Sequence, residues 1–234
     1  MNKAATRTGL GMIIKPQKYR IAFVINTLYY PFTYPEILDS LAARGYTILV
    51  PPQPLQSGAR IYISGQAAAV KATIPNKPPC FIELNESKKI IACESKDVGN
   101  IVAAVKDLVD LFIEDFKLNL PDDINFIELS GSAVVLNDNP IDAIKKFSGT
   151  QYDIFDEIMG EESAGGLIRI IPKNRTQTDR KWFDISIGQR VPSEGNAYFV
   201  EIIFRDGNNL ESILDFISNL DGKISAMITK IGCA

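Results

Sequence analysis

The chain contains no histidine among its 234 residues. Histidine is the commonest general base and the commonest metal ligand, because its pKa lies close to neutral pH. Its absence disfavours metal-dependent and histidine-based catalysis, and the sequence predicts neither a metal nor a cofactor. The sequence also lacks a Walker loop, a nucleophile elbow and a Cys-x-x-Cys pair. An enzymatic activity is therefore unsupported, and we expect a protein that acts by binding.

Cysteines and long apolar runs are also scarce. The three cysteines, Cys80, Cys93 and Cys233, are odd in number and far apart, which predicts reduced thiols in a cytoplasmic protein. No apolar run reaches the ~18 residues that a membrane helix needs. Met1–Gly11 is positively charged but is not followed by the apolar stretch of a signal peptide. We expect a cytoplasmic protein without membrane contact, in which residues 1–18 form a loose arm.

The clearest pattern lies near the end of the chain. Trp182–Val191 alternates between apolar and polar residues, as a half-buried strand does, and residues 192–196 have the composition of a turn. The returning strand places four apolar side chains on one face: Tyr198, Val200, Ile202 and Phe204. Apolar residues then recur at helical spacing from Leu210 to Ile231, after Asn208 as an N-cap. Gly222 lies inside this helical pattern and would permit a bend.

The same plan occurs earlier in the chain. Cys80–Leu84 and Lys89–Cys93 have the composition of two strands joined by a short turn. A helix follows, with Ser95 or Asp97 as its cap and a continuous apolar face from Val98 to Phe116. An internal repeat of this kind has to be recognised before a fold is assigned.

The beginnings of the two halves also match. A strand at Tyr19–Leu28 precedes a short helix bracketed by Pro35 and Gly45. A strand at Ile124–Leu136, with a bulge expected at Gly131, precedes another helix between Pro140 and Gly149. Further strands are expected at Tyr46–Val50, Arg60–Ser64, Ala68–Ile74 and Leu167–Ile171.

These patterns predict two repeats of the order strand, short helix, antiparallel strands, long helix, at residues 19–120 and 121–234. The predicted class is α+β, with one curved antiparallel sheet shared by both repeats. Each long helix must bury its apolar stripe, and a sheet with one apolar face can cover it. We therefore expect both long helices on one sheet face and the opposite face open.

This order resembles the fold of the TATA-box-binding protein family, a saddle of two such repeats. The resemblance covers residues 19–231 and is clearest at Phe126–Leu136, the following short helix and Gly165–Arg169. The chain departs from the family where Ala164-Gly165-Gly166 replaces Phe-Pro-Gly. Phe81 and Phe183 lie on strands that could carry the family's paired phenylalanines. The resemblance implies a saddle that binds nucleic acid, and the helix-grip fold, which often encloses a small ligand, is its nearest rival.

Charge is unevenly placed along the chain, whose net charge is −3. The predicted strands are rich in lysine and arginine, whereas the long helix at Asp97–Phe116 and the segment Asp122–Glu162 are acidic. A basic sheet face could bind phosphates, and neighbouring aromatic side chains, among them Trp182 and Tyr198, could stack on bases. The candidate nucleic-acid-binding residues are Arg169, Lys173, Arg175, Arg180, Lys181, Arg190 and Phe183.

Three alternatives remain open at this stage. The charges could be ordinary solvated edges, and Glu161-Glu162 beside Asp156 could be a solvated acidic loop or a cation site. The open face could bind another protein instead of nucleic acid, as an interaction scaffold. A helix-grip container would hold a small apolar ligand beneath the long helices. Composition alone does not determine the oligomeric state.

Overall fold

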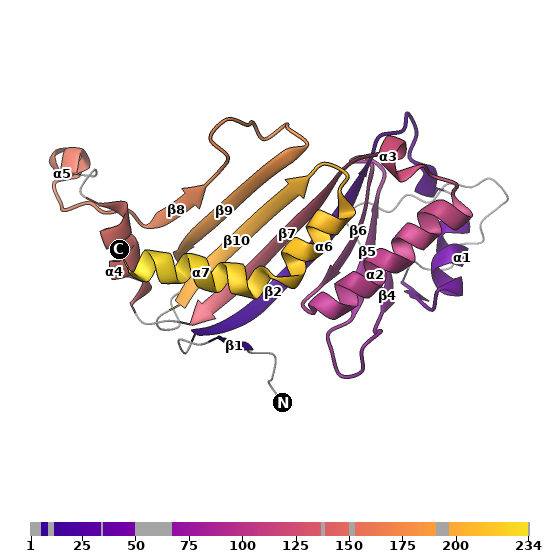
Figure 1. Ribbon diagram of the computed structural model, residues 1–234, viewed down its shortest axis with the longest axis horizontal. Coiled ribbons are helices and arrows are strands. Elements are labelled where there is room, and N and C mark those ends of the chain that lie inside the picture. Colours follow the sequence, from indigo (N-terminus) through magenta and orange to yellow (C-terminus); the bar gives the residue numbers. More distant parts are fainter. Residues whose placement is uncertain are drawn as a thin grey trace.

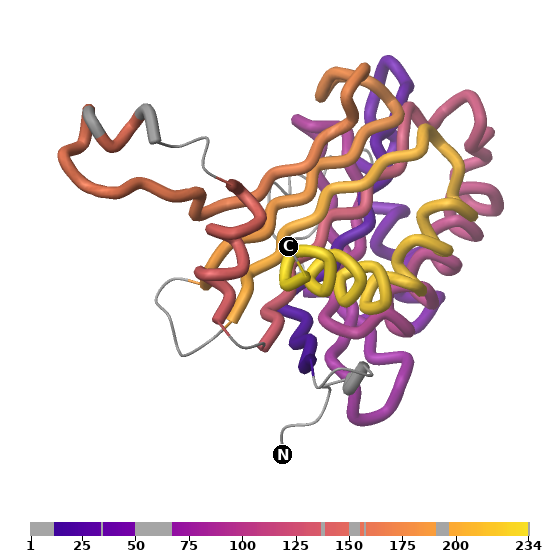
Figure 2. The backbone as a smooth tube through the Cα atoms, turned by 60° about the vertical axis from the view of Figure 1, so that its left-hand side comes forward, coloured from indigo at the N-terminus to yellow at the C-terminus, as the bar shows by residue number. Residues whose placement is uncertain are grey.

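One antiparallel sheet runs through the protein, which is described here from a computed structural model (Figure 1). The structure describes residues 6–8, 12–33, 35–49, 67–136, 139–149, 153–190 and 197–233. Strands from both halves of the chain join in this sheet, and the view in Figure 2 shows the same layer from a second direction. The class is α+β, as the sequence predicts.

The strands pair in an order that differs from their order in the chain. They are β1 (Thr6–Thr8), β2 (Met12–Ile25), β3 (Thr47–Ile48), β4 (Ala67–Lys71), β5 (Cys80–Asn85), β6 (Ile90–Ser95), β7 (Ile124–Leu136), β8 (Leu167–Ile170), β9 (Lys181–Gln189) and β10 (Ala197–Asp206). Across the sheet the order is β3-β4-β5-β6-β2-β7-β10-β9-β8, and β1 pairs with β2. In each half, the last strand of that half lies beside the first, and β2 and β7 meet at the centre.

The first long strand begins earlier than the sequence predicts. β2 starts at Met12 rather than at Tyr19, and both Met12 and Ile14 are buried. Residues 12–18 therefore belong to the sheet and not to a loose arm. Lys15 and Lys18 lie on the solvent side of this stretch. They are three positions apart because of the irregular pairing at Gln17, so the sequence does not show the strict alternation of apolar and polar residues that indicates a strand.

The central strand pair is irregular at two places, one in β2 and one near its far end, between Val24 and Ile25. The pairing of β2 with β7 shifts between Pro16 and Lys18, so Gln17 is the extra residue. Proline cannot donate a backbone hydrogen bond, which suits an interruption of the ladder. The prediction of a bulge at Gly131 is wrong, because Gly131 pairs regularly with Tyr19.

The helices lie mainly on one side of the sheet. They are α1 (Glu36–Ala43), α2 (Val98–Asp110), α3 (Leu120–Asp123), α4 (Pro140–Ser148), α5 (Asp153–Met159), α6 (Leu210–Ser218) and α7 (Leu220–Gly232). A single 3-10 turn at Pro31–Thr33 precedes α1, and a π-helical turn at Leu111–Asp115 continues α2. In Figure 1, α2, α6 and α7 lie in front of the same sheet face, as expected for amphipathic helices that share one core.

The helix α2 forms where its apolar periodicity predicts. The side chain of Asp97 caps it by accepting a hydrogen bond from the Asn100 amide at 3.0 Å. Its inward stripe is fully buried at Ile101, Ala104, Val105 and Leu108. Phe112, in the π-helical turn that follows α2, continues this packing: its ring lies edge-on against Phe23 of β2, with centroids 5.1 Å apart.

The final helical segment is divided into two helices. The division falls at Asn219, whose side-chain amide donates to the Asp215 carbonyl at 3.0 Å, and Gly222 lies inside α7. The cap is Asn209 rather than the predicted Asn208, since the side-chain Oδ1 of Asn209 accepts a hydrogen bond from the Ser212 amide at 3.1 Å.

The two short helices end as predicted, at glycines with positive φ. Gly45 has φ +83° after α1, and Gly149 has φ +69° after α4. Two other expectations fall outside the described residues: the strand at Arg60–Ser64 and the turn at 192–196.

Candidate interaction surfaces

The sheet has a helix face, covered by α2, α6 and α7, and an open face on the opposite side. Side chains alternate between these faces along each strand, so the pairing register assigns each residue to one of them. The charged strand residues on the open face are Lys15, Lys18, Arg20, Arg169 and Arg205, with Glu83, Glu94, Glu128, Asp184 and Glu201. On the strands from β2 to β10, this face therefore carries five basic and five acidic residues.

Most of these charges form ion pairs between neighbouring or next-neighbouring strands. The nitrogen–oxygen distances are 2.9 Å for Arg20–Glu83, 2.5 Å for Lys18–Glu94, 2.6 Å for Arg169–Asp184 and 2.5 Å for Arg205–Glu128. The expectation of a basic open face is thus wrong for the described strands, because acidic residues that are distant in sequence neutralise its cations.

The pair Arg169–Asp184 illustrates this neutralisation. Hydrogen bonds from the Arg169 guanidinium hold the pKa of Asp184 below its usual value. Arg169 itself remains largely solvent-exposed, so the pair contributes little to stability. Its main consequence is that Arg169, a predicted phosphate contact, already has an anionic partner.

The predicted aromatic contact, Phe183, lies on the wrong face for this role. Phe183 pairs with Phe204, whose ring stacks on Phe216 of α6 with centroids 4.0 Å apart. Phe183 and Phe204 therefore both face the helices. Tyr198 is fully buried on the same side, and Trp182 is on the open face but only 5% exposed. Phe81 does reach the open face, so the two phenylalanines suggested by the resemblance lie on opposite sides of the sheet.

The remaining predicted cations are divided between the two ends of β9. Lys173, Arg175 and Arg180 belong to the loop that joins β8 to β9, and Lys181 begins β9 beside them. Arg190 follows the other end of the strand. Arg180 donates to the backbone carbonyls of Asn125 and Ile124, whereas Lys181 pairs with Asp206 at 2.7 Å. The loop, and not the sheet face, is where the predicted cations gather.

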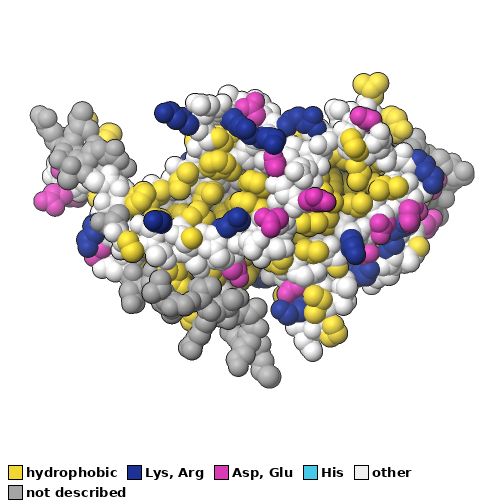
Figure 3. All heavy atoms as spheres, viewed as in Figure 1, with side chains coloured by type: hydrophobic (Ala, Val, Ile, Leu, Met, Phe, Trp, Pro, Cys, Tyr) yellow, Lys and Arg dark blue, Asp and Glu magenta, His cyan; other side chains and the backbone are white. Residues whose placement is uncertain are grey.

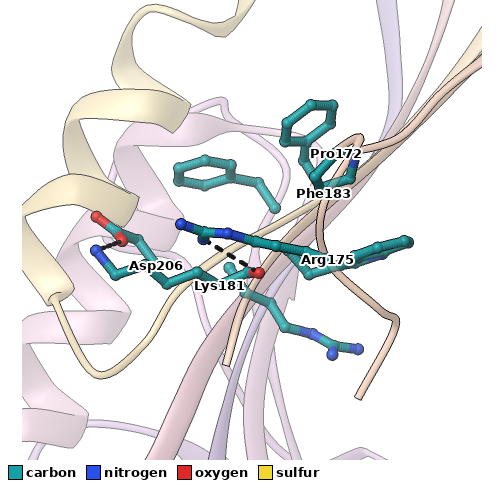
Figure 4. Close-up of a pocket in the computed structure, with 8 residues that line it drawn as sticks. Pro172, Arg175, Lys181, Phe183 and Asp206 are labelled. Atoms are coloured by element: carbon teal, nitrogen blue, oxygen red, sulfur yellow. Dashed lines mark hydrogen bonds and ion pairs between the residues drawn. The ribbon is translucent and has the colours of Figure 1, made fainter. Parts of the chain in front are cut away.

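A pocket of about 390 Å³ opens beside this loop (Figure 4). Its lining residues are Pro172, Arg175, Lys181, Trp182, Phe183, Phe204, Arg205 and Asp206. The guanidinium of Arg175 extends across the pocket near Phe183 and donates to the Lys181 carbonyl at 3.4 Å. The pocket thus combines two phenylalanine rings with a cationic rim. We call it the Phe183 pocket.

An apolar patch on the helix face includes the two phenylalanines of the Phe183 pocket and extends beside it. We define it as Ile170, Phe183, Ile185 and Phe204, which adjoin one another through the pairing of β8, β9 and β10. In Figure 3, hydrophobic side chains gather over this part of the sheet, above α7. The patch is partly exposed, with Ile170 at 39%, because α6 and α7 lie over β7 and β10 and leave the end of β9 uncovered.

The sheet edge beside this patch is apolar as well. Among the described strands β8 pairs with β9 alone, and Leu167 and Ile171 are exposed at its two ends. An edge strand with exposed backbone groups is a template for pairing with another chain. Sequence reasoning found this strand but missed its position at the edge, because strand order depends on pairing between distant segments.

Comparison with known proteins identifies no relative. No family model matches the chain, no curated protein matches its sequence, and no solved structure matches its fold. Among the residues that the structure describes, no group of three or more cysteine, aspartate or glutamate side chains could hold a metal ion. No helix in the described part of the chain is long and apolar enough to cross a membrane.

Proposed function

We propose that this chain is a non-enzymatic binding protein whose partner is another protein, held on the apolar patch of its second half. The observation that carries the proposal is the exposure of Ile170 and the partial exposure of Phe183 and Phe204 beside β8, which lies at the edge of the described sheet. Burying apolar surface stabilises a complex by about 25 cal/mol per Å². A contiguous apolar surface beside an edge strand is typical of protein-binding sites.

The charge balance of the open face also supports a protein partner over nucleic acid. Binding to a polyanion needs cations that are free to neutralise phosphates. Arg20, Arg169 and Arg205 instead have carboxylates within hydrogen-bonding distance.

The test places a photo-crosslinking amino acid at Ile170 in the full chain expressed in its native cells. We expect crosslinked products of defined mass, which disappear when Phe183→Asp is added. The matched control carries the crosslinker at Lys106, an exposed position on α2. Circular dichroism checks that each variant folds. Equal crosslinking at both positions, or none at Ile170, would contradict the proposal.

A second candidate function is nucleic-acid binding through the β8–β9 loop. The observation in its favour is that Lys173, Arg175 and Arg180 are all exposed on this loop, and that Arg175 also lines the Phe183 pocket. Fluorescence anisotropy with labelled single- and double-stranded DNA and RNA, at low salt, tests it. Lys173→Ala and Arg175→Ala together should weaken binding and reduce its salt dependence, whereas Lys106→Ala should not. An absence of binding at low salt would exclude this candidate.

We also infer that the two halves are structural repeats of a saddle like that of the TATA-box-binding proteins. The equivalent strand orders outward from β2 and from β7 support this inference. An experimental structure in which the two halves superpose poorly would contradict it. The helix-grip alternative is less favoured, because Leu108, Phe112 and Ile213 occupy the space beneath the helices and are fully buried.

A further inference from the structure

A short arm extends from the second half of the protein. It consists of α5 and the segment that returns to β8, residues 153–166, and both Figure 1 and Figure 2 show it standing away from the sheet. Ile158 is 73% exposed and Met159 is 70% exposed. These side chains are among the most exposed large apolar residues that the structure describes, so the arm carries an apolar surface with little cover from its own chain.

The arm and the Phe183 pocket have opposite charge. The arm has only acidic charged residues: Asp153, Asp156, Glu157, Glu161 and Glu162. The loop at the pocket is mainly basic, with Lys173, Arg175, Arg180 and Lys181 against Asp179. Both surfaces also expose apolar side chains. An acidic apolar helix and a basic apolar pocket complement each other in both respects.

The two surfaces lie at different ends of β9. The arm joins the sheet at Leu167, which pairs with Gly188, whereas the pocket lies at Lys181 and Phe183. At ~3.3 Å per residue, Gly188 and Lys181 are about 23 Å apart along the strand. In the described structure the arm therefore does not cover the pocket of its own chain, and both surfaces are available to a second molecule.

We propose that two copies of this chain associate as a symmetric dimer, in which the arm of each copy binds the apolar patch and Phe183 pocket of the other. This inference rests on the proposed function and names its partner as a second copy of the same chain. Ile158 and Met159 enter the apolar patch, and Glu161 and Glu162 face Lys173 and Arg175. A two-fold axis makes each contact twice, so two modest sites reinforce each other.

The test measures the mass of the full chain by sedimentation velocity across a range of micromolar concentrations. The double variant Glu161→Lys/Glu162→Lys reverses the two arm charges that face the pocket, and Lys173→Glu/Arg175→Glu reverses the two opposing charges of the loop. Each alone places like charges together and should weaken the dimer by at least about tenfold. An equimolar mixture should restore a heterodimer, because every arm then has a pocket of opposite charge. Ile158→Ser should weaken the dimer without changing charge.

Matched controls reverse charges on α2, with Lys106→Glu and Asp110→Lys, and should leave the dimer unchanged. A chain that stays monomeric, or a dimer that ignores both reversals, overturns the proposal. The crosslinker at Ile170 separates this failure from that of the proposed function. Crosslinks to a different protein together with a monomeric chain reject only the dimer, whereas no crosslinks at all reject both.

Discussion

The ring of Tyr19 in β2 lies against Gly131 in β7, at the centre of the strand pair that joins the two halves. A Cβ atom added at Gly131 would come within 2.8 Å of Cδ1 of Tyr19. The ring is almost completely buried, and burial raises the pKa of the Tyr19 hydroxyl above its ordinary value, helped by the nearby Asp221 carboxylate of α7. Gly131 is therefore required for close packing and not for a bulge.

Substitution Gly131→Ala should destabilise the protein by about 1–3 kcal/mol, because the tyrosine ring or the strands must shift. Gly222→Ala is the control. No atom lies within 4 Å of its added Cβ, and alanine is favoured over glycine in a helix by about 1 kcal/mol. Urea unfolding measures both variants. Equal stability of Gly131→Ala and the parent chain would show that the Tyr19 ring does not exclude a larger side chain at position 131.

Truncation of the two helix-core residues tests the packing of the sheet. Leu108→Ala and Ile213→Ala should each cost about 2–5 kcal/mol, because both side chains are fully buried. Ile113→Ala is a control, since Ile113 is about half exposed and should cost much less. A loss below about 0.5 kcal/mol at Leu108 or Ile213 would place that helix away from the core.

The buried amide of Asn100 connects α2 to the segment before β5. Its Oδ1 accepts from the amides of Thr73 at 3.0 Å and Ile74 at 3.1 Å, and its Nδ2 donates to the Pro78 carbonyl at 2.8 Å. Asn100→Ala leaves these backbone groups unpaired, at about 1–3 kcal/mol for each. We expect a marked drop in the free energy of unfolding, whereas Asn219→Ala, at an exposed position, should change it little. Similar values for the two variants would refute this role.

The three cysteines should differ in their reactivity. Cys80 and Cys93 are buried, and Cys233 is exposed. Hydrogen bonding to Cys80, together with burial, raises the pKa of the Cys93 thiol, which lowers its thiolate fraction. An aromatic disulfide reagent should label Cys233 quickly and the other two only after unfolding. Fast labelling of all three thiols in the native protein would contradict the buried positions.

The hydroxyl of Tyr198 should make stability sensitive to alkaline pH. Burial raises the pKa of Tyr198, and its hydroxyl has no hydrogen-bond partner among the described residues. A pKa raised by folding leaves stability intact below the unfolded value of ~10 and reduces it as pH rises above that value. Tyr198→Phe should be at least as stable at neutral pH and should lose less stability above pH ~10. Parallel pH profiles of the two proteins, followed by thermal unfolding, would exclude this effect.

Local pattern in the sequence determined most of the secondary structure. The strand Ile124–Leu136 has the predicted bounds, and α2 begins after its predicted cap Asp97. The hairpin strands at Cys80 and Ile90 also form where alternation indicates. These features follow from periodicity and capping, which involve residues only a few positions apart.

The tertiary structure alone decided the chemistry of the surfaces. Arg20 and Glu83 are 63 positions apart and Arg205 and Glu128 are 77 apart, yet each pair meets and cancels its charge. Strand pairing likewise turns Phe183 toward the helices and leaves β8 at the sheet edge. Such neighbours depend on strand order and register, and these arise from burial of the whole apolar face and not from local sequence. Composition along the chain therefore indicated basic strands, whereas in the folded sheet the open face of β2 to β10 carries balanced charges and the helix face carries a partly exposed apolar patch.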